Sequence, residues 1–293
     1  MKFAFIAEHL SEFEVQACCQ ALEVSRSGYY AWIARPPSAQ VQRRLELSEK
    51  INAAHAENRQ VYGSPRICQA LLSQGVAVCR NTVAKLMKQQ GIRAKTKRRF
   101  VPRTTNSRHN HPIAPNRLER NFTSEKPDQV WLADISYIPT DEGWLYLAAI
   151  KDMATREIVG WSMADHLRTG LCIDALVMAL QRHPPTPGLI HHSDRGVQYA
   201  SEPYRAVLER HGLLQSMSRR GNCLDNAPME SMFAALKVEH VHHCRFATRE
   251  AAKAAVFDYI EVFYNRQRLH SGIGYRTPAE ARMVMEGITG LAA

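Results

Sequence analysis

The feature that most restricts the fold is the order of apolar segments after Pro127. Three strand-like segments follow one another with short turns between them: VWLADISYI (130–138), GWLYLAAIKD (143–152) and EIVGWSM (157–163). Such a run is typical of an antiparallel meander. Helical and strand-like patterns then alternate: a helix at 169–182, a strand at 188–192, a helix at 201–211, a strand at 213–218 and a helix from Ala227. This order predicts an α/β layer fold with a mixed five-stranded sheet and flanking helices.

The N-terminal third has no comparable strands and is predicted to be all-helical. Residues 12–33 have apolar side chains at helical spacing and predict two short helices, the second capped by Ser25. One helix fits 41–57. Another is expected after an N-cap at Ser64, with Pro65 in its first turn.

The segment from Ser64 to Gly91 has the punctuation of a helix-turn-helix. Gly75 is expected to end the first helix, and a second helix follows at 79–90 before Gly91. Two helices joined by a tight glycine-containing turn form the helix-turn-helix pattern, although a plain helical hairpin has the same pattern. The second helix would present Arg80, Asn81, Lys85 and Lys88 outward, where such side chains can contact phosphates and base edges of DNA.

Charge is distributed unevenly along the chain, although the formal net charge is only +10. Residues 1–126 contain 21 Lys and Arg against nine Asp and Glu, whereas the remainder contains 17 against 19. No acid lies between Glu57 and Glu119, and 13 basic residues fall in that interval. This asymmetry indicates a polyanionic partner for the N-terminal half, and a solvated basic face is the weaker reading.

Five regions are expected from these patterns. They are a short helical, helix-turn-helix-like segment at 1–37, a helix-turn-helix DNA-binding domain at 38–93, a basic linker at 94–126, an α/β core at 127–240 and a helical extension of that core at 241–293. The linker is rich in basic residues, Pro, Asn and Ser and is expected to follow a DNA backbone through Lys95, Lys97, Arg98 and Arg99.

Several classes of protein are disfavoured. The seven cysteines include no CxxC pair, which argues against a disulfide framework and favours a reducing compartment. The tight cluster His242-His243-Cys244 has no second ligand pair at zinc-finger spacing. No apolar run approaches the ~18–20 residues of a membrane span, and the N-terminus does not resemble a secretion signal. The protein is therefore expected in a reducing cytoplasm, without a membrane partner.

Three acids stand out in the predicted core. Asp134 interrupts the first apolar strand, where a charge is costly unless it is paired or metal-bound. Asp194 follows the fourth strand, and the two acids would meet if these strands are neighbours. Glu230 falls in the first turn of a helix that begins after Asn226, while Met229, Phe233 and Leu236 face inward. Oxygen ligands of this kind suit Mg²⁺ or Mn²⁺ better than Zn²⁺.

Each acid also has an ordinary structural explanation. Asp134 could be salt-bridged, Asp194 could cap a turn with Arg195-Gly196, and Glu230 is favoured in a first helical turn by the helix macrodipole. Asp152 and Asp225 are rival ligands, but both are expected to be turn residues.

Four longer strings carry a resemblance to a known family: WLADISYI, HHSDRGVQYAS, GNCLDNAPMESMFAALKVE and YNRQRLHSGIGYRTPAEA. In this order they resemble the second-frame proteins (OrfB) of bacterial insertion sequences of the IS3 type. VYGSPRI and NTVAKLMKQQGIRA are similar to the helix-turn-helix of that family. The order Asp134, Asp194, Glu230 resembles the DDE triad of transposases and retroviral integrases, and the resemblance covers residues 12 to 284.

The resemblance implies an RNase H-like integrase core with two Mg²⁺ (or Mn²⁺) ions held by Asp134, Asp194 and Glu230. Lys237 matches a basic residue that the family places two turns after its glutamate, where it contacts terminal DNA. The implied reaction is hydrolysis at the element's end, followed by attack of the freed 3′-OH on a second phosphodiester. Because oxygen ligands suit these ions, His191 and His192 are expected to line the site rather than to bind metal.

The resemblance also implies partners. These are the terminal inverted repeats of the element, target DNA, further copies of the same chain, and an upstream-frame (OrfA-type) protein or fusion. An alternative function is therefore that of a DNA-binding regulatory or partner protein that needs such a fusion for activity. Two departures from the family pattern are Ser136, where Thr is usual, and Cys79, where a Ser cap is usual and cysteine caps poorly.

Overall fold

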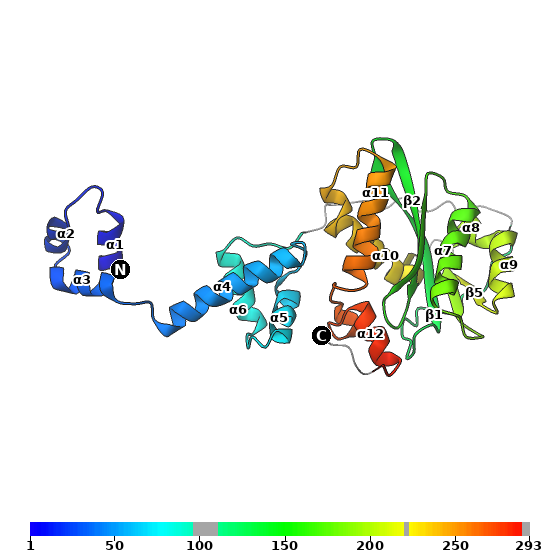
Figure 1. The fold of residues 1–293 in the computed structure, drawn as a ribbon, viewed down its shortest axis with the longest axis horizontal. Coiled ribbons are helices and arrows are strands. Elements are labelled where there is room, and N and C mark those ends of the chain that lie inside the picture. Colours follow the sequence, from blue (N-terminus) through cyan, green and yellow to red (C-terminus); the bar gives the residue numbers. More distant parts are fainter. Residues whose placement is uncertain (96–110, 220–222, 289–293) are drawn as a thin grey trace. The chain divides into compact units, whose positions relative to one another are not determined.

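The computed structural model describes residues 1–95, 111–219 and 223–288 (Figure 1). The chain divides into two compact units, Met1–Ala53 and Ala54–Ala293, and helix α4 (Ala39–Glu57) crosses the division. Three of the predicted DNA-contacting residues, Lys97, Arg98 and Arg99, lie outside the described residues. No helix in the described part combines the length and apolar character needed to cross a bilayer.

The first unit is a small helical cluster. Helices α2 (Val15–Ala21) and α3 (Arg26–Ala34) confirm the two predicted short helices, and the Ser25 side chain accepts a hydrogen bond from the Gly28 backbone N–H at 3.0 Å, as expected of an N-cap. The sequence did not indicate α1 (Lys2–Glu8), which buries a single side chain, Ile6. Ile6 packs with Cys18, Cys19 and Tyr29 in the core of this unit.

The second unit begins with the predicted helix pair. Helices α5 (Ser64–Ser73) and α6 (Arg80–Gln89) are joined through Gly75, whose positive φ of 76° suits glycine. The expected N-cap at Ser64 is wrong: Gly63 occupies that position, and Ser64 is already the first helical residue. Side chains on the inner faces of the two helices are buried: Ile67, Cys68, Leu71, Val83, Leu86 and Met87.

A mixed five-stranded sheet forms the centre of the core, as the segment order predicted. Its strands are β1 (Val130–Thr140), β2 (Gly143–Asp152), β3 (Ile158–Ala164), β4 (Ile190–Ser193) and β5 (Leu214–Met217). Their order across the sheet is β3-β2-β1-β4-β5. The first three strands pair antiparallel, whereas β4 pairs parallel with both β1 and β5. The first and fourth strands are therefore neighbours.

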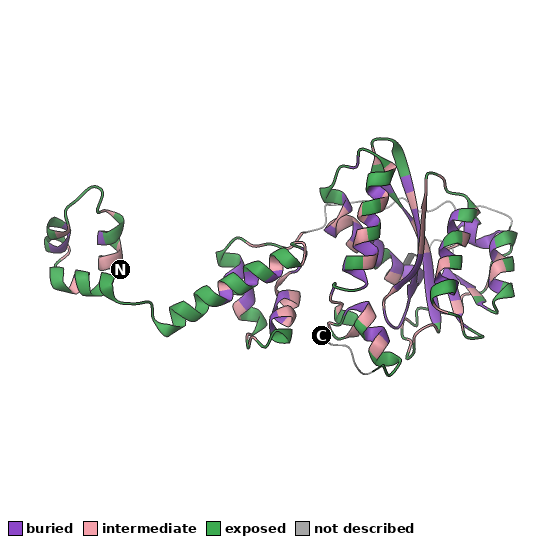
Figure 2. Cartoon of the chain, viewed as in Figure 1, coloured by how far each residue is buried: buried purple, intermediate pink, exposed green. Residues whose placement is uncertain are grey.

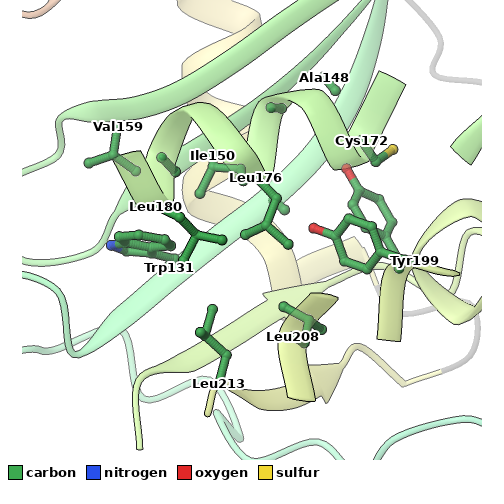
Figure 3. Packing of buried hydrophobic residues seen from close by; sticks show 14 of the residues in the cluster. Trp131, Ala148, Ile150, Val159, Cys172, Leu176, Leu180, Tyr199, Leu208 and Leu213 are labelled. Carbon is green, nitrogen blue, oxygen red and sulfur yellow. The ribbon is translucent and has the colours of Figure 1, made fainter. Parts of the chain in front are cut away.

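Helices cover both faces of this sheet (Figure 1). On one face α7 (Thr169–Arg182) packs close to β3, since a Cβ on Gly160 would lie 2.3 Å from the carbonyl oxygen of Ala175. Trp131, Leu176 and Tyr199 belong to the apolar cluster on that side (Figure 3). The short α8 (Val197–Ala200) and α9 (Glu202–Arg210) lie near α7.

The other face carries α10 (Ala227–Glu239) and α11 (Arg249–Phe257), and α12 (Pro278–Met285) follows them in the chain (Figure 1). Helix α11 is followed directly by a π-helical stretch at Asp258–Tyr264. Directly after it, the Asn265 side chain makes two bonds to the backbone of Ile158, at 2.9 and 3.1 Å. These bonds fix the C-terminal extension to the edge strand β3.

Residues 111–126, the later part of the predicted linker, contact the core. The backbone N–H of Arg117 donates to the Ser216 hydroxyl at 2.9 Å, and the Asn116 side chain donates to Asp225 at 3.2 Å. Burial is highest along the sheet and the facing sides of its helices (Figure 2).

Candidate active site

Strand pairing brings Asp134 and Asp194 together. The parallel register of β1 and β4 ends with Ala133 opposite Ser193, and each aspartate is the next residue of its chain segment. Neighbouring strands lie about 4.8 Å apart, so the two carboxylates start from adjacent positions. Beyond this point β4 has ended while β1 continues to Thr140 beside β2 alone. The aspartates therefore occupy the place where two parallel strands separate.

Short local hydrogen bonds orient both carboxylates. The backbone N–H of Ile135 donates to Asp134 Oδ1 at 2.8 Å, and that of Gly196 donates to Asp194 Oδ1 at 2.8 Å. A Cβ on Gly196 would lie 2.9 Å from the same Asp194 oxygen, which explains the glycine. Arg195 Nε donates to the carbonyl of Ser218 at 2.7 Å, which fixes the turn that follows β4.

The electrostatics of the pair favour a bound cation. Burial raises the pKa of Asp134 well above its ordinary value, and the charges of Asp194 and, more weakly, Glu230 raise it further. The Ile135 N–H and the charge of Lys237 oppose this rise. Adjacent carboxylates that disfavour each other's ionisation can both be charged when positive charge is placed between them.

Glu230 stands at the edge of the site on α10. The first turn of that helix is attached to the sheet by two bonds: Asn226 Nδ2 donates to the carbonyl of Ala133 at 3.1 Å, and Lys151 Nζ donates to that of Pro228 at 3.1 Å. Asn226 is at the predicted N-cap position, but its side chain bonds the sheet rather than the helix. Glu230 is exposed, and partial desolvation of its carboxylate by neighbouring atoms raises its pKa.

The inward face of α10 is as predicted: Met229, Phe233 and Leu236 are at most 6% exposed. Because these side chains fix the rotation of the helix, Glu230 is held at the rim, one residue after Met229. The sequence therefore predicted the orientation of α10 correctly.

The donor set fits a hard divalent cation, although the acids do not close around one point. Within residues 1–95, 111–219 and 223–288, no three His, Cys, Asp or Glu side chains lie close enough to hold one ion. The structure thus brings Asp134 and Asp194 together and leaves Glu230 nearby on an exposed helix turn. Two adjacent carboxylates and a third at their rim match the oxygen ligands that Mg²⁺ and Mn²⁺ prefer.

His191 and His192, which the sequence predicted to line the site, are engaged with other side chains. Both are fully buried on β4; His191 Nε2 lies 3.0 Å from the Tyr204 hydroxyl, and His192 bonds two serine hydroxyls at 2.9 and 3.1 Å. Burial lowers the pKa of His191 to about 3 and that of His192 to about 4. Both rings are therefore neutral at physiological pH and add no positive charge beside Asp194.

Asp152 and Asp225, the two alternative candidates for metal ligands, make hydrogen bonds to other residues. Asp152 is fully buried at the end of β2 and accepts hydrogen bonds from Asp128 and twice from Thr155, which closes the turn to β3. Asp225 is also fully buried and is bonded by Arg219 at 2.8 Å and Arg120 at 3.1 Å. Side-chain and backbone bonds from Arg219 outweigh burial and hold the pKa of Asp225 well below its usual range.

The predicted DNA-contacting residues fall into two groups. Arg80, Asn81, Lys85 and Lys88 are all exposed on α6, on the side away from its buried residues. Lys95 is half-buried instead, and its ammonium donates to the carbonyl of Glu239 at 3.2 Å. In the core, Lys237 Nζ lies 4.6 Å from the ring centroid of Tyr137, on the side of the carboxylate pair.

Sequence reasoning missed a buried ion pair that holds the end of α10. Glu239 is 8% exposed, and Arg268 binds its carboxylate through two nitrogens at 2.6 and 2.8 Å, while the Tyr259 hydroxyl donates at 2.7 Å. Arg268 belongs to the segment YNRQRLHS. The many polar residues in this segment were the sign in the sequence that it makes specific polar contacts.

Residues before α5 and in its first turn contact the same C-terminal string. The hydroxyl of Tyr62 donates to the carbonyl of Gln267 at 3.1 Å and accepts from the Leu269 N–H at 2.8 Å. Arg66 Nε donates to the carbonyl of Leu269 at 2.9 Å, and an Arg66 nitrogen lies 3.9 Å from Glu239. The helix pair is thereby linked to the end of α10.

Comparisons with known proteins agree with this architecture. Family models described as integrase core domain match residues 124–223 and 230–283, and one described as HTH-like domain matches residues 42–100. Among solved structures, the chain is similar to the catalytic core domain of BIV integrase (TM-score 0.41, 15% identity, 55% of this chain and 97% of that one). It is also similar to the simian T-cell lymphotropic virus intasome in complex with PP2A regulatory subunit B56 gamma (TM-score 0.47, 14% identity, 73% and 70%).

Curated relatives are much closer in sequence. The insertion element IS600 uncharacterized 31 kDa protein of Shigella sonnei is 48% identical over 264 residues, which is 90% of this chain and 97% of that one. Transposase InsF for insertion sequence IS3A of Escherichia coli (strain K12) is 44% identical over 282 residues, or 96% and 98%. With an integrase core, a helix-turn-helix and such identity over nearly full length, the chain belongs to the family of InsF transposases of IS3 insertion sequences.

Proposed function

We propose that this transposase cuts and joins DNA at the ends of its insertion sequence through Asp134, Asp194 and Glu230. The observation that carries the proposal is the pair of aspartates placed side by side where β1 and β4 separate. Integrase core domains depend on a divalent metal ion. We assign these three carboxylates as ligands of two Mg²⁺ or Mn²⁺ ions.

The residues of the chain have separate tasks in this reaction. Bound ions would supply positive charge for both the attacking and the leaving oxygen of the phosphodiester. Asp134 and Asp194 form a rigid pair on paired strands, whereas Glu230 completes the site from α10. Lys237 contributes a cation beside the pair and contacts a phosphate of the terminal DNA. His191 and His192 remain neutral and keep the wall of the site free of competing charge.

The reaction has two steps with one chemistry. Water first attacks the phosphorus at the element's end, which breaks the bond to the 3′ oxygen and releases a 3′-OH and a 5′-phosphate. The 3′-OH then attacks a second phosphodiester, forms a new bond to that phosphorus and displaces the 3′ oxygen of the neighbouring nucleotide. No covalent intermediate with the protein is needed, and the number of phosphodiester bonds is unchanged in the second step.

DNA recognition is assigned to the N-terminal half. The exposed face of α6, with Arg80, Asn81, Lys85 and Lys88, is suited to lie along DNA, and Lys97, Arg98 and Arg99 extend the basic stretch beyond it. We further propose that the protein acts as a homo-oligomer on the inverted repeats, together with an upstream-frame protein or fusion. The relatives do not favour the alternative of a purely regulatory DNA-binding protein.

The test compares one carboxylate with a matched surface acid. Asp194→Asn is expected to reduce strand transfer on DNA carrying the element ends by at least about 100-fold, the upper end of the loss seen when only a partner of a metal ligand is removed. Asp174→Asn, which changes an exposed acid on α7, is expected to leave it unchanged. EDTA should abolish the activity, and Mg²⁺ or Mn²⁺ should restore it. Strand transfer by Asp194→Asn at the normal rate would refute the assignment.

A further inference from the structure

Two exposed aromatic rings lie on the hairpin that extends from the carboxylate site. Tyr137 on β1 is 37% exposed and Trp144 on β2 is 48% exposed. Their ring centroids are 5.0 Å apart and the ring planes meet at 79°. Exposure of large aromatic rings to water is unfavourable, so an exposed pair beside a reaction site indicates a binding surface.

The geometry of the sheet explains why both rings are accessible. Trp144 pairs with Pro139, two residues beyond Tyr137, so the two rings are diagonal neighbours on one face of the hairpin. In the described part of the chain β4 pairs with β1 only as far as Ala133. The hairpin therefore projects past β4 from Asp134 onward, and it carries the rings with it.

Two cations lie beside this pair. Lys237 Nζ lies 4.6 Å from the Tyr137 ring centroid, a distance typical of a cation–π contact. Arg249 Nε donates to the backbone carbonyl of Trp144 at 3.1 Å, which places a second cation next to that residue. Aromatic rings interleaved with cations are the usual composition of surfaces that bind single-stranded nucleic acid.

We propose that Tyr137 and Trp144 form a stacking platform for an unpaired nucleobase of the DNA strand that reacts at the carboxylate pair. The platform rests on the proposed function, because its ligand is the strand whose phosphodiester is cut there. Tyr137 is three residues from Asp134, about 10 Å along the strand, and the two side chains leave opposite faces of β1. Lys237 connects them, because its charge acts on Asp134 and its Nζ lies 4.6 Å from the Tyr137 ring centroid. A stacked strand advances about 3.4 Å per nucleotide, and an unstacked strand advances more. The base that stacks is therefore within about three nucleotides of the scissile phosphate.

The base must be unpaired because a ring can stack on it only after it leaves the duplex stack. An end whose last base pairs are opened reaches the platform without the cost of unstacking. Stacking tolerates any base, so the platform positions the strand and does not read its sequence. Lys237 would hold the phosphate next to the stacked base.

The test uses a probe without sequence requirement, a fluorescein-labelled dT12 oligonucleotide, and measures binding to the full chain by anisotropy. Trp144→Ala and Tyr137→Ala are each expected to weaken binding by about 5- to 140-fold, the effect of losing one stacked base. Trp144→Phe should retain part of the affinity. Phe257→Ala is the matched control, because that ring is 49% exposed and also meets a tryptophan edge-on, Trp161, at 5.9 Å.

Salt dependence separates stacking from charge. Trp144→Ala should lower the affinity at every salt concentration without changing the slope of log K against log salt, whereas Lys237→Ala should make the slope shallower. A dT12 probe carrying 5-iododeoxyuridine should photo-crosslink to Tyr137 or Trp144. Equal binding by Trp144→Ala and Phe257→Ala, or crosslinks elsewhere only, would overturn the platform.

The two proposals fail separately. Binding of dT12 tests the rings, whereas loss of strand transfer by Asp194→Asn tests the carboxylates. If Trp144→Ala binds normally but Asp194→Asn is inactive, the platform is wrong and the carboxylate assignment stands. If Asp194→Asn is active and Trp144→Ala binds weakly, the rings bind single strands for another purpose and the link to the reaction is lost.

Discussion

Replacing Glu239 by glutamine tests whether the end of α10 depends on its buried ion pair. Glu239→Gln preserves the shape of the side chain but removes the charge that faces Arg268, whose side chain is only 8% exposed. Burial lowers the pKa of Arg268, and the bonds and charge of Glu239 outweigh that effect and raise it. Arginine is not deprotonated in proteins, so the guanidinium stays charged in the variant and loses its counter-ion.

Removing one partner of a buried ion pair costs about 3–5 kcal/mol of unfolding free energy. For a unit of this size, 1 kcal/mol corresponds to about 2–4 °C, so the melting temperature should fall by about 6–20 °C. Urea unfolding followed by tryptophan fluorescence measures the effect, since Trp131 is fully buried in the sheet. The double variant Glu239→Gln with Arg268→Met should be more stable than Glu239→Gln alone, because no uncompensated charge remains.

The control is a surface pair of similar geometry. Glu250 accepts from Lys253 at 2.6 Å, but its side chain is 80% exposed, so Glu250→Gln should cost at most about 1 kcal/mol. If Glu239→Gln and Glu250→Gln lower the free energy of unfolding by the same amount, the buried pair does not hold α10 and the reasoning is refuted.

Three further predictions concern stability and DNA binding. Burial lowers the pKa of Lys151 from 10.5 to about 7, so between these pH values the unfolded chain binds more protons than the folded protein. The free energy of unfolding should therefore rise with pH from about 7 to 10.5, and Lys151→Met should flatten that rise in urea titrations. Lys85→Ala with Lys88→Ala should weaken DNA binding and reduce its salt slope by up to about 2, and an unchanged slope would show that α6 does not face DNA. Gly160→Ala should lower the unfolding free energy by about 1–3 kcal/mol, because the added Cβ would meet the Ala175 carbonyl 2.3 Å away and α7 must shift; full stability in a thermal melt would contradict this.

Local patterns were sufficient to predict most of the elements. The strands of the meander are apolar runs bounded by turn residues, so β2 was placed at 143–152 with its observed ends, as was α7 at 169–182. From the sequence, Asp134 and Asp194 could meet only if β1 and β4 were neighbours, which the sequence did not show. The structure shows that these strands are neighbours. Short elements with little burial, such as α1, produce no periodic signal and were missed.

Features that depend on distant residues could not be predicted. The prediction of an N-cap at Ser64 was wrong because Gly63 adopts the extended conformation that begins the helix one residue earlier. Asn226 was recognised as a helix start, but its bond to Ala133 joins residues 93 positions apart. Glu239 and Arg268 are both ordinary surface types in sequence, and only the folded arrangement makes them a buried pair. The aromatic platform likewise depends on where β4 ends.

The attachment of α10 to Arg268 has a consequence during synthesis of the protein. The basic helix pair leaves the ribosome first, the meander with Asp134 follows, and Arg268 emerges last of these parts. At about 5–20 residues per second, the interval from Asp134 to Arg268 is about 7–27 s. Throughout that interval the nascent chain already contains the meander with Asp134 but lacks the residue that anchors α10, the helix of Glu230. The arrangement of α10 is therefore completed only after almost the whole chain has been made.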